Sequence, residues 1–254
     1  MPIREGRITG PLRKGMNRIN AGGGEYATAN SINLDGVDEY VDFGAVTAVR
    51  FDKSDPFSVS VWMKPNGTGG TDTFAAAATT STTHGWRIYR TGSRFGISIY
   101  NTITSNEIKV QTSASSASDG VWGHYVFTYD GSEAASGVTI YKDGSSVTPS
   151  VQVDNLTTAI SNTGSLWIGF DGGGQYGAGH IDEFVVYNSE ITSGDVTNLY
   201  NGGNPVTPSA TNRVFWCKCG EDASYPTLQD QDSAATGTMT NTEAGDITTD
   251  VPSA

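Results

Sequence analysis

The chain has 254 residues and a formal net charge of −12 at pH 7, so its body is acidic and lacks the basic face that a nucleic-acid partner requires. No apolar run approaches the roughly 18 residues of a membrane span, and no apolar segment follows the basic start, so we expect neither a span nor a secretion signal. Hydrophobic residues make up 36% of the chain and glycines number 32, which favours many short strands and turns over long helices.

Residues 1–30 are the first predicted unit, a basic and glycine-rich arm. In the first twenty residues five basic side chains face only Glu5, a local net charge of +4, so the rest of the chain carries −16. The five are Arg4, Arg7, Arg13, Lys14 and Arg18. We expect this arm to dock on a partner, because an acidic groove would hold it. The alternative is a solvated tail.

Strand signals begin at Ser31. SINLDGVDEYVDFG predicts a strand, an Asp-Gly turn and a second strand, and residues 66–83 predict a long loop or a weak strand. Apolar residues alternate with others in further segments, which predicts strands at 57–65, 84–90, 95–100 and 107–111.

The strongest hairpin signal lies between Asp119 and Gly144. Aromatic and β-branched residues alternate from Trp122 to Tyr129, as on a half-buried pleated strand. A second strand at 138–141 stops at Asp143-Gly144, a dipeptide typical of tight hairpin turns. The rest of the chain is organised around this hairpin.

Later segments vary in strength. Residues 147–163 have a loose pattern, whereas 165–170 and 180–188 have strand character. The one helical signal starts at Ser193, a possible N-cap, and Gly202 ends it.

Cys217 and Cys219 are the only cysteines, and a bridge between residues this close on a strand would be strained. His84, His124 and His180 are scattered singly, so a zinc site with four ligands is not expected. We interpret the cysteines as two thiols on the inner face of a strand.

Six segments occur in one order: SINLDGVDEYVDFG, FSVSVWMKP, DGVWGHYVFTYDG, IYKDG, LWIGF and GHIDEFVVYNSEITSGDVTNLYNGG. In this order and spacing they resemble the laminin-G-like, concanavalin A-like jelly rolls. The resemblance implies an all-β fold, a two-sheet antiparallel jelly-roll sandwich, over residues 31–204. It says little about function, because one fold hosts many functions.

The tail from Arg213, RVFWCKCGEDASYPTLQDQDSAATGTMTN, resembles the strand and Asp-rich turn that this family usually places before its SINLDG-like strand. Because the termini of such domains can lie close together, we expect residues 205–254 to supply an edge strand to the same sandwich. The tail is also similar to those of virion proteins from tailed bacteriophages.

Catalysis is not expected. Retaining glucanases on this fold need two carboxylates about 5 Å apart, and no glutamate here lies in such a motif. Asp182 and Glu183 are adjacent, and neighbours on a strand point to opposite faces. No serine lies in a nucleophile-elbow glycine pattern, although composition alone does not exclude a Ser-His-Asp triad.

Calcium is the expected metal, because acidic side chains in turns supply the oxygen ligands it prefers. The family resemblance implies a structural calcium between the first Asp-Gly turn and the late G-x-I-D strand, which nominates Asp35, Asp38 and Asp182. The alternative is that Asp35 and Asp38 only form turns and Asp182 is a hydrogen-bonded cap.

A sugar site would join aromatic rings to polar groups. In HGWRIYRTGSRFGISIY, alternation turns four side chains away from the core, and a glycine-rich loop further on adds three more candidates. The candidates are Arg87, Tyr89, Arg94, Tyr100, Gln175, Tyr176 and His180, which could bind an acidic glycan. A solvated sheet face or a subunit contact would give the same pattern.

Two functions follow from these patterns. The first is a non-enzymatic bacteriophage virion accessory protein, which sits on the virion surface in several copies. It would dock on capsid or tail proteins through its arm and serve in cementing or surface adhesion. The alternative is a stand-alone, calcium-assisted carbohydrate-binding module that takes host-surface or environmental glycans. A third, weaker possibility is an enzyme of an unrecognised branch.

Overall fold

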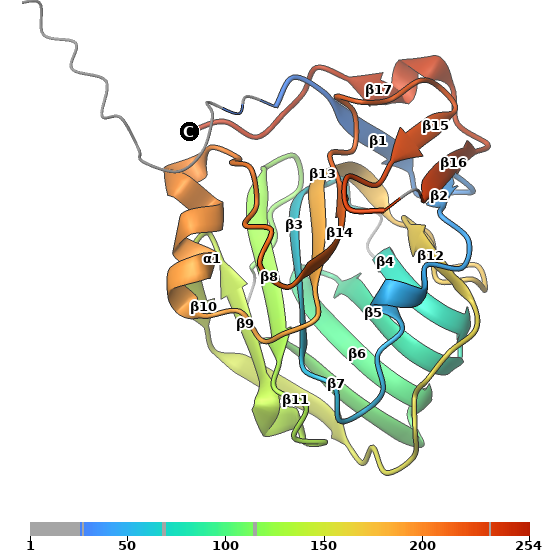
Figure 1. Ribbon diagram of the computed structural model, residues 1–254, viewed down its shortest axis with the longest axis vertical. Coiled ribbons are helices and arrows are strands. Elements are labelled where there is room, and N and C mark those ends of the chain that lie inside the picture. Colours follow the sequence, from blue (N-terminus) through green and yellow to red (C-terminus); the bar gives the residue numbers. More distant parts are fainter. Residues whose placement is uncertain (1–25, 27, 68–69, 114–115, 234) are drawn as a thin grey trace, which may run out of the picture.

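The computed structural model describes residues 26, 28–67, 70–113, 116–233 and 235–254. This part of the chain forms two antiparallel sheets that pack face to face (Figure 1). The expected all-β, two-sheet jelly-roll sandwich is therefore confirmed. The basic residues of the predicted arm, Arg4, Arg7, Arg13, Lys14 and Arg18, lie outside the described residues.

Sheet A contains eight strands of the described chain, in the order β10-β9-β8-β3-β13-β1-β17, with β14 paired to β13 as well. Their bounds are β1 (Ser31–Asp35), β3 (Phe57–Pro65), β8 (Gly123–Tyr129), β9 (Val138–Lys142), β10 (Ser145–Val147), β13 (Ala178–Tyr187), β14 (Arg213–Cys217) and β17 (Ile247–Thr248). The predicted central hairpin is β8 and β9, which pair directly in sheet A.

Sheet B contains nine described strands in the order β11-β7-β6-β5-β4-β12-β2-β16-β15. Their bounds are β2 (Tyr40–Asp42), β4 (Thr71–Thr80), β5 (Thr83–Thr91), β6 (Arg94–Thr102), β7 (Asn106–Thr112), β11 (Pro149–Asp154), β12 (Ser165–Ile168), β15 (Thr227–Gln229) and β16 (Thr236–Thr240). The segment expected as a long loop or a weak strand thus contains the strand β4, held between β5 and β12.

The core lies between the sheets and follows the period-two pattern. Alternate residues of β3 and β8 from sheet A meet alternate residues of β5 and β6 from sheet B. Phe57 of sheet A stacks on Phe51 at 4.6 Å and lies 5.8 Å from the Trp86 ring of sheet B. The Trp86 indole donates a hydrogen bond to the Val49 carbonyl at 3.0 Å, which satisfies its one polar group.

The segment after residue 204 adds strands to both sheets. β14 pairs with β13 in sheet A, while β16 pairs with β2 in sheet B. Phe215 of β14 is fully buried, with its ring 4.9 Å from Phe43 and 5.8 Å from Phe184. Both cysteine side chains are buried in the same core and are unbridged. The C-terminal segment is therefore an integral part of the sandwich.

The helix α1 (Ser193–Tyr200) covers the outer face of sheet A (Figure 1). Its N-cap is Thr192, one residue before the predicted Ser193, because Thr192 Oγ1 accepts from the Asp195 amide while the Asp195 carboxylate accepts from the Thr192 amide. The 3₁₀ turns are Thr47–Val49, Ala135–Gly137, Asn201–Gly203 and Ala244–Asp246. No helix in the described residues is both long enough and apolar enough to cross a membrane.

Candidate functional site

The outer face of sheet B, turned away from the core, carries most of the predicted sugar-binding residues. One row of register partners crosses five strands from β12 to β7. It consists of Trp167, Ala76, Arg87, Ser98 and Lys109.

A closed polar layer covers the centre of this face. Arg87, Tyr89, Ser98, Tyr100 and Glu107 are each at most 4% exposed. Arg87 donates to the Gln175 amide oxygen at 2.9 Å and forms an ion pair with Asp171 at 3.5 Å. Among the described residues neither Arg87 Nε nor the Tyr100 hydroxyl, both buried, has a hydrogen-bond partner.

Above this layer stands a half-buried group of aromatic side chains, the aromatic group, made of Tyr40, Trp167, Phe170 and Tyr176. Phe170 stacks on Tyr176 with ring centroids 4.7 Å apart, and Tyr40 lies 4.7 Å from Phe170. Gly172 lies over the Trp167 ring, where a Cβ would come within 2.8 Å, and its φ of 82° also favours glycine. The glycine-rich loop therefore brings aromatic rings next to polar groups.

The structure brings together five of the seven predicted sugar-binding residues. Arg87, Tyr89, Tyr100 and Gln175 meet in or beside the polar layer, and Tyr176 joins the aromatic group. Arg94 is exposed at the first residue of β6, and His180 lies on sheet A, where its ring faces Ser31 and Thr248. These two are therefore separate from the proposed sugar surface.

Sequence reasoning missed several members of this surface. Lys109 is half-buried and its Nζ lies 4.8 Å from the Tyr89 ring centroid, a cation–π contact. Lys109 alternates with the buried residues Ile108 and Val110 along β7, so period two alone would have placed it on the same face as Glu107 and Gln111. Nothing in the local sequence places Tyr40 or Phe170 there, because their meeting depends on how β2 and the glycine-rich loop fold.

A second feature is the acid cluster, formed by Asp182, Glu183 and Glu221. Ligand oxygens of all three lie within 4.8 Å of one another. The expectation that Asp182 and Glu183 point to opposite faces is wrong, because the register of β13 against β3 shifts after Asp182 and Glu183 has a φ of 49°. This β-bulge turns both neighbouring carboxylates toward Glu221.

The hydrogen bonds of the acid cluster come from the segment before β1 and from β14. The Tyr26 hydroxyl and the Trp216 indole both donate to Glu183, the latter at 2.8 Å. Thr28 Oγ1 lies 2.7 Å from Asp182 Oδ2 and 2.6 Å from Glu221 Oε1. Glu221 Oε2 is buried and has no hydrogen-bond partner among the described residues.

Burial raises the pKa of the Asp182 and Glu183 carboxyls, and the neighbouring acids raise it further for Asp182. Asp182 is fully buried and Glu183 is 3% exposed, so their charges are not solvated. Lys218 is the nearby cation that acts on Glu183. Three carboxylates with an unpartnered buried oxygen require either protons or a bound cation, and hard oxygen donors fit calcium.

The other predicted calcium ligands are not part of this cluster. Asp182 follows Ile181, the register partner of Ile32, whereas Asp35 pairs with Ala178 at the other end of β1. Three residues along a strand separate Ile32 from Asp35 by about 10 Å. Asp35 accepts from the Val37 amide and forms its own turn, with exposed Asp38 beyond it. The expected trio is therefore divided, and Glu183 and Glu221 accompany Asp182 instead.

One pair on the outer face of sheet A has the composition of a nucleophile and its base. Ser60 Oγ lies 2.8 Å from His124 Nε2, but His124 Nδ1 is buried with no hydrogen-bond partner among the described residues. Both residues are at most 2% exposed, and the Trp62 ring lies 4.9 Å from the imidazole. This arrangement favours a packed polar pair over a catalytic triad.

The buried His124 predicts acid sensitivity. Burial lowers its pKa from the usual 6.5 to about 3, so between these values the unfolded chain binds more protons than the folded chain. The contribution of neutral His124 to the free energy of unfolding is complete above pH 6.5. It is lost as the pH falls toward 3, at up to about 1.4 kcal/mol per pH unit. Urea denaturation at pH 7, 5 and 4 measures this loss. His124→Gln, which does not titrate, should show a shallower pH dependence, and equal dependence would contradict the prediction.

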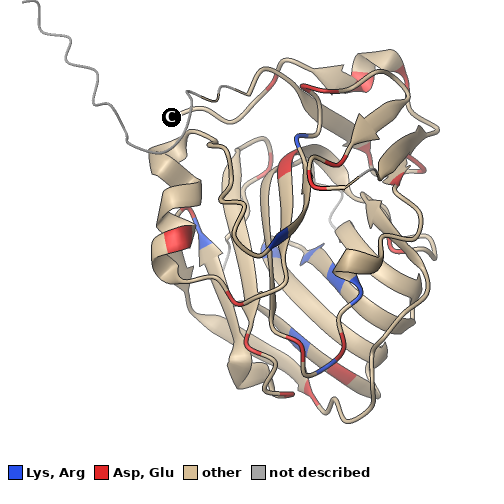
Figure 2. Cartoon of the chain, viewed as in Figure 1, with Lys and Arg blue, Asp and Glu red and all other residues tan. Residues whose placement is uncertain are grey.

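Charge is distributed unevenly over the fold. Acidic residues occur in loops around much of the sandwich, while several Lys and Arg residues lie within strands (Figure 2). Arg87 of β5 is buried on the outer face of sheet B, 3.5 Å from Asp171. Arg90, whose register partner is the core residue Phe95, lies on the inner side of β5 and pairs with Asp119 at 2.6 Å. The positive charge near the aromatic group therefore lies within a sheet and in a fixed position.

Comparisons with known proteins agree with this architecture. The family model Laminin_G_3, described as the concanavalin A-like lectin/glucanases superfamily, matches residues 35–197. No curated protein matches the chain significantly. Many solved structures are similar to it, all of those compared here at low sequence identity, and they therefore show the fold alone.

Three solved structures illustrate the similarity. A Bacteroides ovatus protein provisionally named as carbohydrate binding has a TM-score of 0.61 and 16% identity, covering 90% of this chain, which spans 62% of that protein. A heptameric SAP-like pentraxin of Limulus polyphemus has a TM-score of 0.54 and 15% identity, over 83% and 95% of the two chains. The CBM40 module of a Ruminococcus gnavus sialidase, bound to α2,3-sialyllactose, has a TM-score of 0.52 and 10% identity, over 67% and 95%.

Proposed function

Because the chain belongs to the concanavalin A-like lectin/glucanases superfamily, we propose that it is a carbohydrate-binding, lectin-like domain whose sugar site is the outer face of sheet B. The observation that carries this proposal is the position of the half-buried aromatic group beside a polar layer whose edge includes the half-buried side chains of Gln175 and Lys109. Rings that offer an apolar face next to fixed polar groups are what a sugar site requires. The names of similar solved structures, two of which refer to carbohydrate binding, support the same function.

In this proposal the residues have distinct roles. A sugar ring stacks on the half-buried faces of Tyr176 and Tyr40, while Gln175 and Lys109 contact its polar groups from the edge of the polar layer. Arg87 holds Gln175 in place through the 2.9 Å hydrogen bond. Because Lys109 adds a cation on the rim, an acidic sugar is the favoured ligand class.

We also propose calcium as a structural cofactor of this domain, bound by the acid cluster. A calcium ion would replace the protons that buried carboxylates otherwise need, and Glu221 Oε2 offers a ready ligand oxygen. The cluster joins the segment before β1 to β13 and to the turn after β14. The ion would therefore fix the junction between the segment before β1, β13 and the turn after β14.

The expected role in a bacteriophage virion stays a prediction that rests on residues 1–30 and on the C-terminal tail. A sugar-binding domain on a virion surface would serve the adhesion part of that hypothesis. Docking on other virion proteins through Arg4 to Arg18, in several copies, is its remaining part.

Tyr176→Ala is the sharpest test of the sugar site. Loss of one stacking ring is expected to weaken binding about ten-fold for a glycan first identified on an array of neutral and acidic glycans. Isothermal titration measures the affinity, and thermal melting shows that the variant is folded. Arg94→Ala is the matched control, because Arg94 is exposed at the start of β6, outside the aromatic group and the polar layer. Equal affinities of Tyr176→Ala and Arg94→Ala for the glycan, or no binding to any glycan on the array, would refute the site.

A further inference from the structure

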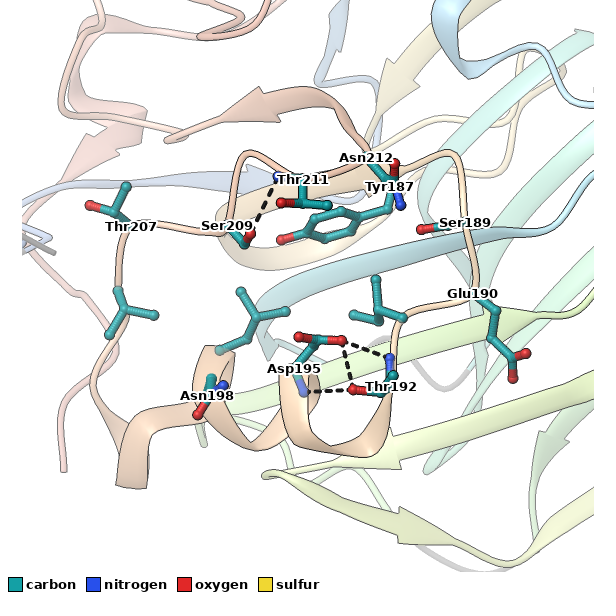
Figure 3. A pocket seen from close by; sticks show the side chains of 13 residues that line it. Tyr187, Ser189, Glu190, Thr192, Asp195, Asn198, Thr207, Ser209, Thr211 and Asn212 are labelled. Atoms are coloured by element: carbon teal, nitrogen blue, oxygen red, sulfur yellow. Dashed lines mark hydrogen bonds between the residues drawn. The ribbon is translucent and has the colours of Figure 1, made fainter. Parts of the chain in front are cut away.

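A separate pocket of about 280 Å³ opens between the helix α1 and the segment that follows it, residues 205–212 (Figure 3). It belongs to the outer side of sheet A, where Tyr187 ends β13, and so it is distinct from the proposed sugar site on sheet B. Its walls combine hydroxyl, amide and carboxylate groups, with Ile191, Leu199 and Val206 as apolar lining.

Tyr187 gives the pocket a polar centre. The residue is only 2% exposed, and its hydroxyl makes no hydrogen bond with the described residues. In Figure 3 this hydroxyl points toward Ser209 on the loop side of the pocket. The phenol ring is buried while its hydroxyl reaches the cavity, so a ligand group in the pocket can hydrogen-bond to it.

The charges of the lining limit the kind of ligand. The lining residues, all of them described, include the acids Glu190 and Asp195, while Arg213 lies beside Tyr187 and donates to the Pro208 carbonyl of the loop, so the charges around the pocket favour an uncharged ligand. Asp195 uses one carboxylate oxygen, Oδ2, to cap the helix at Thr192, and its other oxygen has no such partner in the described chain. Asn198 and Asn212 add side-chain amides on the two walls. These groups are acceptors and donors for hydroxyls.

We propose that this pocket is a second binding site that takes a neutral polyhydroxyl ligand of the size of one sugar ring. Its volume of about 280 Å³ lies just below the range of about 300–1,000 Å³ found for small-molecule sites, which favours a single sugar ring over a longer saccharide. Ligand hydroxyls bond to Tyr187, Asp195 and Asn198, while its C–H faces lie against Leu199 and Val206. The domain then has one site on each side of the sandwich.

The test uses the full chain and the free sugars D-glucose, D-galactose and D-mannose. Titration followed by amide NMR is expected to shift the signals of α1 and of residues 205–212, with affinity weakened about ten-fold in Tyr187→Phe. This variant removes only the unpartnered hydroxyl, so it should fold normally. Asn198→Ala, at an exposed position on α1, is a second variant with the same expected loss.

Tyr176→Ala separates this site from the proposed sugar site on sheet B, because it should leave the signals of α1 unchanged. Failure of the sheet B site and failure of this pocket are therefore distinguishable. No shift in α1 with any of the three sugars, or equal affinity of Tyr187→Phe and the unaltered chain, would overturn the proposal. Shifts caused by methylammonium and not by the sugars would assign the pocket to a cation instead.

Discussion

A chain that ends at Asn204 is expected to lose cooperative unfolding, because the missing segment fills the core and pairs with both sheets. Phe215, Cys217, Leu228 and Met239 are all at most 4% exposed and come from this segment. Without β14 and β16, the facing strands β13 and β2 lose backbone partners as well. Differential scanning calorimetry and near-ultraviolet circular dichroism measure the loss of the transition and of fixed aromatic packing.

A point substitution tests the same role without removing a chain segment. Phe215→Ala leaves a cavity between Phe43 and Phe184 and is expected to destabilise the protein by about 3–5 kcal/mol. For a chain of this length that lowers the melting temperature by on the order of 10 °C. Val151→Ala is the control, because Val151 is 54% exposed on β11 and its loss should cost about 0.5 kcal/mol or less. A cooperative transition of the shortened chain at the original temperature would show that the segment is dispensable.

Calcium is expected to raise the melting temperature by about 5–10 °C over that in EDTA. Binding to the folded state alone contributes about 2.7 kcal/mol when the free ion is at one hundred times its dissociation constant. Each kcal/mol corresponds to about 2–4 °C for a domain of this size. Thermal melting with calcium and with EDTA gives the shift directly.

Glu221→Gln is the decisive variant for calcium. The amide oxygen can still accept from the Ala29 and Asn30 backbone amides, so the fold is kept while a ligand charge is removed. The increase in melting temperature caused by calcium should disappear. In EDTA the variant should be at least as stable as the unaltered chain, because the substitution removes one carboxylate charge from the acid cluster. Asp35→Asn is the control and should keep the full shift, since Asp35 lies at the other end of β1. Equal shifts in the two variants would remove the acid cluster as the calcium site.

The sequence by itself determined the fold class, because the alternation of apolar residues along β3, β5, β6 and β8 fixes which side of each strand is buried. Trp86 and Ile88 had to face the core once Arg87 and Tyr89 faced away, and the structure has this arrangement. The helix after β13 and the turn at Asp143-Gly144 also follow from local residue chemistry. Period-two patterns are local, so they can be read without knowing the neighbours of a strand.

Only the tertiary structure decided which residues form the sites. Glu221 lies next to Asp182 because β14 pairs with β13. Glu183 joins them because of the β-bulge after Asp182, which no pattern in the sequence of β13 predicts. Likewise, Tyr40 meets Tyr176 only because β2 pairs with β12 and the loop after β12 brings Tyr176 next to β2. A residue's face follows from strand geometry, whereas its partners follow from the order in which strands pair and from where the loops fold back.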